Sequence, residues 1–270
     1  MTTNTGWVAT PPRRGDLARV LLAEWTKFRT VRASHWTLTV SATITVALGA
    51  TVLAGILEDY DAMTPARQAT FDPTAEGLWY HGLHLGQVVL AVLGVLVATS
   101  EYSTGTIYPT LAATPNRLRV FTAKTLGFGG LTAAVGLVQA YTMFAIAQPI
   151  LAGRELNVAL TDPAALRGVA WAAAATAGVA LLGLGAGLLL RHTAAAVTTV
   201  LVVMLGIPII GLFLPRSWSS VTRYLPADAG WALFTPTGQA LDVGPAAAVF
   251  FGYVAVLLAA AAAALVRRDA

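Results

Sequence analysis

The stretch VAWAAAATAGVALLGLGAGLLL, residues 169–190, contains no Asp, Glu, Lys or Arg and is long enough to cross a bilayer as a helix. A hydrocarbon core of about 30 Å needs roughly 20 helical residues. The blocks of Ala, Leu and Gly do not alternate apolar with polar residues, as a membrane-spanning β-barrel requires. The stretch therefore predicts a transmembrane α-helix.

Other apolar runs free of charged residues lie on both sides of this one. They cover residues 36–57, 83–99, 126–151, 194–214 and 246–266. The chain is 56% hydrophobic and 11% charged, with a mean hydropathy of +0.69, so it has too few polar residues for a water-exposed surface. We expect a single all-α integral membrane domain over residues 1–270, with six transmembrane helices and a flexible N-terminal tail at 1–16.

The basic residues between the runs predict which side each connection faces. Most of them fall before the first run, in the second and fourth connections, or after the last run: Arg13, Arg14, Arg19, Lys27, Arg29, Arg32, Arg117, Arg119, Lys124, Arg191, Arg267 and Arg268. Short loops rich in Lys and Arg stay in the cytoplasm, so both termini are expected there. The net charge of +4 follows from this orientation, and no nucleic-acid partner is needed to explain it.

Residues 17–34, just before the first run, predict an amphipathic helix. Apolar residues recur at helical spacing on one face, and Glu24 lies within that apolar stripe. Lys27 and Arg32 are among the basic residues placed elsewhere around the helix. Such a helix would lie in the headgroup layer, with Trp25 at the interface and its basic side chains near anionic lipid. A plain basic anchor, packed against nothing, is the alternative that the residues leave open.

The connection EYSTGTIYPTLAATPNRLRVFTAK, Glu101–Lys124, is longer than two adjacent helices need. Gly105 and the sequence Thr114–Asn116 supply breaks around a mildly apolar stretch that is too short to span. We expect a short cytoplasmic helix here, between spans two and three. A small helix projecting below the membrane is suited to docking on a soluble partner, while an ordinary packed loop remains the simpler interpretation.

Three strings in the chain resemble those of a known family. AEWTKFRTVRASHWTL (Ala23–Leu38), the Glu101–Lys124 connection and YLPADAGWAL (Tyr224–Leu233) occur in the expected order. They are similar to the permease subunits of type-2 ABC exporters, particularly those of actinobacterial type. The resemblance implies a multi-pass protein of the bacterial cell membrane that works as a homodimer, or as a heterodimer with a similar permease, in contact with membrane lipid.

In that family, separate ATPase subunits dock on cytoplasmic coupling helices and drive the permease. ATP and Mg would bind to those partner chains, and no phosphate-binding Gly-x-x-x-x-Gly-Lys-Ser/Thr loop occurs here. The chain itself is therefore expected to bind no cofactor or metal and to catalyse no reaction. The resemblance assigns coupling to Glu101, Tyr102, Gly105, Thr106, Pro115, Arg117 and Arg119, and movement of the interfacial helix to Glu24, Lys27 and Arg32.

Three glutamines lie in the apolar runs as candidates for the transport pathway. Gln87, Gln139 and Gln148 are unfavourable in lipid unless they are hydrogen-bonded or face a wet cavity. Polar contacts between packed helices explain them more simply than substrate contacts do. Pro208 is expected to kink the fifth span or to leave a carbonyl free.

Two other classes of function stay open. An intramembrane lipid-modifying enzyme or hydrolase would need reactive groups, and His81 and His84 are three residues apart near the end of the second span. Two histidines without a third strong ligand are more typical of interfacial polar residues. The chain has no Cys and no Gly-x-Ser-x-Gly turn. A membrane anchor or immunity protein that binds a partner without transport is the third class.

Overall fold

The computed structural model describes residues 16–73, 82–114, 116–234 and 241–267, and the regular structure within them is helical. The tail expected at 1–16 lies outside these residues apart from its last position. The elements are α1 (Asp16–Thr30), α2 (Arg32–Glu58), η1 (Tyr60–Ala62), α3 (Pro65–Ala69), α4 (His84–Ser103), α5 (Ile107–Ala113), α6 (Arg117–Ala152), α7 (Pro163–Leu190), α8 (Thr193–Leu201), η3 (Val202–Gly206), α9 (Ile207–Gly211), η4 (Arg216–Trp218), α10 (Ser219–Thr222), α11 (Pro226–Trp231) and α12 (Val243–Arg267).

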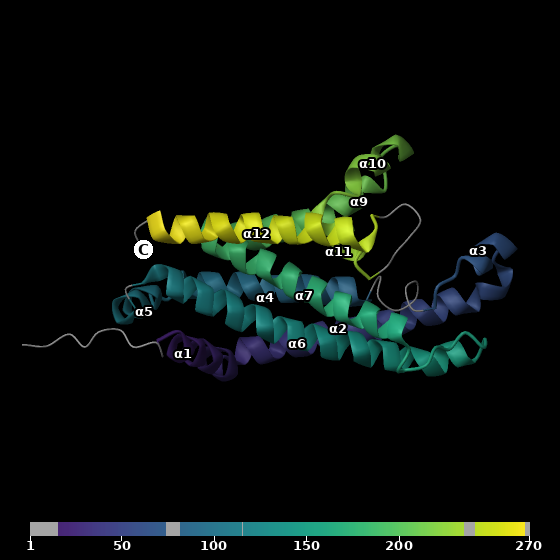
Figure 1. Cartoon of the computed structure of the whole chain (residues 1–270), viewed down its shortest axis with the longest axis horizontal. Coiled ribbons are helices and arrows are strands. Elements are labelled where there is room, and N and C mark those ends of the chain that lie inside the picture. Colours follow the sequence, from purple (N-terminus) through teal and green to yellow (C-terminus); the bar gives the residue numbers. More distant parts are fainter. Residues whose placement is uncertain (1–15, 74–81, 115, 235–240, 268–270) are drawn as a thin grey trace, which may run out of the picture.

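In the described part of the chain, six helical segments are long and apolar enough to span a membrane. They are α2, α4, α6, α7, the segment Thr193–Gly211 and α12. These segments confirm the predicted all-α class and fit a multi-pass membrane protein. Figure 1 shows the long helices side by side along the longest axis, with α5 and the C-terminus at one end and α3 at the other. We call these the α5 end and the α3 end.

Several helices begin earlier than the apolar runs predicted, because polar residues cap them. The side chain of Asn116 accepts a hydrogen bond from the backbone N–H of Arg119 at 3.1 Å, so α6 starts at Arg117 and not near 126. Asp162 caps α7 in the same way, and Pro163 takes its first position. With 36 residues, α6 is about 54 Å long and exceeds the thickness of a hydrocarbon core.

The central helix is α7, which packs against α4, α6, α8 and α12. Its apolar stretch is 72% buried inside the protein, whereas that of the fifth span is only 17% buried. Small residues let α7 approach α4 closely: Gly183 lies against the backbone carbonyl of Ala91, where a Cβ atom would not fit. Gly187, four residues later, also lies against α4, so these two glycines with Gly-x-x-x-Gly spacing mark the helix contact.

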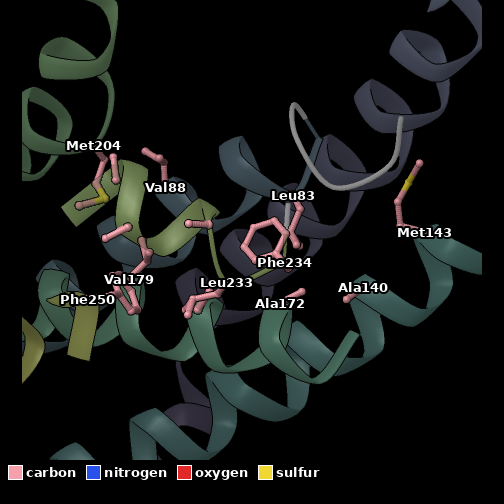
Figure 2. Close-up of a cluster of buried hydrophobic side chains, with 14 of the residues drawn as sticks. Leu83, Val88, Ala140, Met143, Ala172, Val179, Met204, Leu233, Phe234 and Phe250 are labelled. Atoms are coloured by element: carbon pink, nitrogen blue, oxygen red, sulfur yellow. The ribbon is translucent and has the colours of Figure 1, made fainter. Parts of the chain in front are cut away.

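A hydrophobic cluster joins the long helices to the short ones near the α3 end (Figure 2). Phe250 of α12 is fully buried, and its ring lies against Gly178 of α7 and Gly230 of α11. Leu233 and Phe234, which follow α11, are also buried in this cluster. The short helix α11 is thereby fixed against two spanning helices.

The fifth span is irregular where Pro208 interrupts it. The helix widens into a π-helical turn, η3, before α9 begins at Ile207. Proline has no N–H to donate to the preceding turn, which explains a local break in the hydrogen-bond ladder. The predicted kink is thus a π-helical widening. Short helices α10 and α11 follow in the long connection, with Pro226 at the first position of α11.

Candidate functional site: a buried charge cluster

The helix α1 carries a buried acid on its apolar face. α1 packs against α6, and its Phe28 ring lies 5.8 Å from the ring of Phe128 on α6. Glu24, one turn before Phe28, is only 1% exposed. The acid that lay within the predicted apolar stripe is therefore turned into the protein, where an ionised carboxylate needs a partner.

The second acid of the site, Glu101, lies in the last turn of α4 and is 6% exposed. The chain then turns at Gly105, whose φ of +70° favours glycine, and enters α5. Glu101 was expected to start a connection, but the structure places it inside the helix. Glu101 therefore fixes the residues that lead into α5, which we call with α5 itself the α5 segment (residues 101–117), against the core of the bundle.

The third member, Lys124, lies in the early turns of α6 and is 2% exposed. Sequence reasoning placed it in the connection and gave it no role in the site. Its neighbours Val120, Phe121 and Phe128 are apolar and buried. A lysine among apolar residues at helical spacing was the signal that could have identified it.

These residues form one cluster together with Lys27. The Nζ atom of Lys124 lies 2.9 Å from Oε2 of Glu24 and 2.8 Å from Oε1 of Glu101. The Nζ atom of Lys27 lies 2.6 Å from Oε1 of Glu24 and 2.8 Å from Oε1 of Glu101. Two positive and two negative side chains balance each other, and every ion is paired. We call these four residues the charge cluster.

The charge cluster is buried on one side and exposed on the other. Lys124, Glu24 and Glu101 have side chains at most 8% exposed, whereas that of Lys27 is 41% exposed. Burial opposes the charge on Lys27, but hydrogen bonds to Glu101 and Glu24 outweigh it and raise the pKa of Lys27 above 10.5. Lys27 therefore holds the two acids in place as an ammonium ion at neutral pH.

Two further contacts join the α5 segment to other helices. An N–H group of Arg117 donates to the backbone carbonyl of Leu265 on α12 at 3.1 Å. The guanidinium of Arg191, which follows α7, lies 5.0 Å from the centre of the Tyr102 ring. Residues on either side of α5 thus contact α1, α12 and the residue that follows α7, and Glu101 contacts Lys124 of α6.

The other predicted coupling and interfacial residues lie outside the charge cluster. Thr106 is exposed at the start of α5, and the backbone of Arg119 is held by the α6 cap. Arg32 is exposed and begins α2, because the chain breaks at Val31 and the predicted helix 17–34 ends at Thr30. Pro115 lies outside the described residues.

The three glutamines all find partners inside the protein. Gln87 of α4 donates to the hydroxyl of Thr176 on α7 at 3.1 Å, and Gln139 of α6 donates to Ser41 on α2 at 3.0 Å. Gln148 accepts from the backbone N–H of Val158 at 2.7 Å. Packing contacts between helices account for the first two, and the role of these residues in a pathway stays a prediction.

His84 takes part in a contact with α11. Its Nδ1 atom accepts a hydrogen bond from Nε1 of Trp231 at 2.6 Å, and the two rings meet edge to face. His81 lies outside the described residues. In the part that is described, no three His, Cys, Asp or Glu residues gather as they would around a metal ion.

Comparison with models of known protein families gave no match, and neither did a search of the curated proteins.

Proposed function

We propose that this chain is the permease subunit of an ATP-binding cassette exporter, and that α5 docks on the ATPase subunit. In this proposal both termini are cytoplasmic and the protein lies in the bacterial cell membrane. The α5 end would then face the cytoplasm, where the ATPase and its ATP and Mg are located. A second permease copy, identical or similar, would complete the transporter.

The observation that carries the proposal is the charge cluster. Two of the strings that resemble exporter permeases, AEWTK at Ala23–Lys27 and EYSTGT at Glu101–Thr106, are far apart in the chain. Their charged residues meet in one buried set of ion pairs with Lys124. Burying ions is costly, so this arrangement favours a functional connection between α1 and the α5 segment over a plain basic anchor.

The proposed coupling route follows from these contacts. Force applied to α5 would reach α4 through Glu101 and α6 through Lys124, because these residues lie on either side of α5. Glu24 and Lys27 would carry the same movement into α1, which lies in the headgroup layer in this proposal. The exposed Trp25 is suited to that layer. The helices would move as rigid bodies when the ATPases close.

The docking surface can be tested with the exposed side chain of Tyr108 on α5, which is 59% exposed. The tagged chain, expressed in its host, is purified in mild detergent, and copurifying ATP-binding cassette proteins are identified by mass spectrometry. Tyr108→Ala should reduce their recovery several-fold. Tyr253→Ala, at a tyrosine 43% exposed on α12, is the matched control and should leave recovery unchanged.

Two results would contradict the proposal. A chain that purifies without any ATP-binding cassette protein would favour an anchor. Catalytic activity of the purified chain alone towards lipid or peptide would favour an intramembrane enzyme.

A further inference from the structure

A cavity of about 500 Å³ lies towards the α3 end, at a distance from the charge cluster along the bundle. It is lined by residues of α2, the first turn of α4, the η3–α9 part of the fifth span, and α10 and α11. Most of the lining side chains are apolar, among them Leu48 and Met204. Its size is that of a pocket for a small organic molecule.

One acid faces this apolar cavity. Asp228 of α11 is half-buried, and its carboxylate makes no hydrogen bond or ion pair with any residue that the structure describes. Burial raises the pKa of this carboxyl above its ordinary value of 3.8. A carboxylate in such surroundings is stabilised by a cation placed beside it.

The other titratable group in the lining does not supply that cation. The Nδ1 atom of His84 accepts a hydrogen bond from Nε1 of Trp231, so this nitrogen carries no proton that it could offer to Asp228. Arg223, near α11, donates to the carbonyl of Ser220 and lies over the ring of Tyr224. Among the side chains that the structure describes, no cation therefore lies beside Asp228, and a ligand can supply the complementary charge.

The lining also limits what kind of cation fits. Divalent metal ions need several oxygen ligands, and Asp228 is the only carboxylate among the described residues that line this cavity. Ile209 and Leu212, which also line it, are 54% and 81% exposed, so the cavity opens onto an apolar surface of the fifth span. In a membrane that surface gives access from the lipid. The ligand therefore combines one positive charge with an apolar body.

We propose that this cavity binds a lipophilic ammonium ion, with its N–H groups on Asp228 and its apolar body between α2 and the η3–α9 segment. The edge of Trp231, fixed by its bond to His84, would close one side of the site. The ammonium can belong to a free amine or to the headgroup of a lipid, since both present the same chemistry. The inference does not depend on the proposed transport function, because binding is measured on this chain alone.

The test uses the full chain purified in dodecyl maltoside. Binding of 1-adamantylamine is compared with that of 1-adamantanol, a neutral molecule of the same shape, by isothermal titration calorimetry at neutral pH. The amine should bind about tenfold more tightly than the alcohol. Asp228→Asn should remove this preference, whereas Asp228→Glu should retain most of it.

A matched variant, Asp242→Asn, removes an exposed acid from the loop before α12 and should not change either affinity. The melting temperature of each variant shows that it is folded. Adding phosphatidylethanolamine identifies the source of the ammonium: competition with the amine indicates a lipid headgroup, and no competition indicates a free amine. Equal binding of amine and alcohol to the wild-type chain, or an unchanged preference in a folded Asp228→Asn variant, would overturn the proposal.

Discussion

Lys124 and Glu24 are 100 residues apart in the chain, yet their Nζ and Oε2 atoms lie 2.9 Å apart in the interior. Their pairing joins the short helix α1 to the long helix α6. With Glu101 and Lys27 they connect α1 to both sides of α5. This contact is the structural basis of the proposed coupling.

Removing the buried lysine should destabilise the fold strongly. Lys124→Met leaves Glu24 and Glu101 buried with only one cation, and an uncompensated buried charge costs about 3–5 kcal/mol. Lys27→Met is the matched control, because the Lys27 side chain is 41% exposed and water can replace it. Thermal unfolding in detergent should show a much larger loss for Lys124→Met. Equal losses of stability in the two variants would mean that water reaches Lys124 and that the charge cluster is not buried.

The pairing of Glu24 with Lys124 should make the effects of the two substitutions on the free energy of unfolding non-additive. Glu24→Gln and Lys124→Gln, singly and together, form a double-mutant cycle whose coupling energy should be about 1–3 kcal/mol. Arg154, which pairs with the exposed Asp61 at the α3 end, provides the comparison. The effects of Glu24→Gln and Arg154→Gln on the free energy of unfolding should be additive. A cycle without coupling between Glu24 and Lys124 would show that the two side chains do not interact.

The close contact of α4 and α7 predicts opposite effects of the same substitution at two glycines. A methyl group at Gly183 would meet the carbonyl oxygen of Ala91, so Gly183→Ala should lower stability by about 1–3 kcal/mol. Gly252 of α12 has no atom within 4 Å of an added Cβ, and Gly252→Ala should stabilise the helix by about 0.5–1 kcal/mol. Melting temperatures of the two variants test this. A neutral Gly183→Ala would argue against this helix packing.

The pH dependence of stability should reveal the burial of Asp228. Because its pKa is raised in the folded protein, Asp228 takes up a proton there at a higher pH than in the unfolded chain. Its contribution to stability is therefore fully present at low pH and is lost as the pH rises through the raised pKa. Asp228→Asn should raise the melting temperature at about pH 7, and this advantage should shrink towards about pH 4. A melting temperature of Asp228→Asn that exceeds that of the wild type by the same amount at both pH values would contradict this assignment.

The spanning helices could be predicted because each is a long uncharged run, and hydropathy alone reports such runs. Their ends could not be read from hydropathy. An uncharged run ends before Glu101, and the next one begins after Lys124. Glu101 nevertheless lies within α4 and Lys124 within α6, because the two side chains neutralise each other across the bundle. Asn116 and Asp162 mark the true helix starts, and their capping side chains were visible in the sequence.

The candidate site was predicted in part. Glu24, Lys27 and Glu101 were singled out by resemblance, and the position of Glu24 in an apolar stripe already required a buried partner. That partner, Lys124, was not recognised: its place among apolar residues marks it as a buried lysine, but no local pattern shows which distant acid it meets. The acid at 228 was missed for the same reason: its cavity is formed by elements from several parts of the chain.

The most direct test of the central claim is the rate of ATP hydrolysis by the partner ATPase in liposomes, with and without this chain. The chain should change that rate several-fold. The double variant Glu24→Gln, Lys124→Gln should still bind the ATPase, because α5 is intact, but should lose much of the effect on its rate. An ATPase rate that is identical with and without the chain, under conditions where the chain is folded and inserted, would contradict the account.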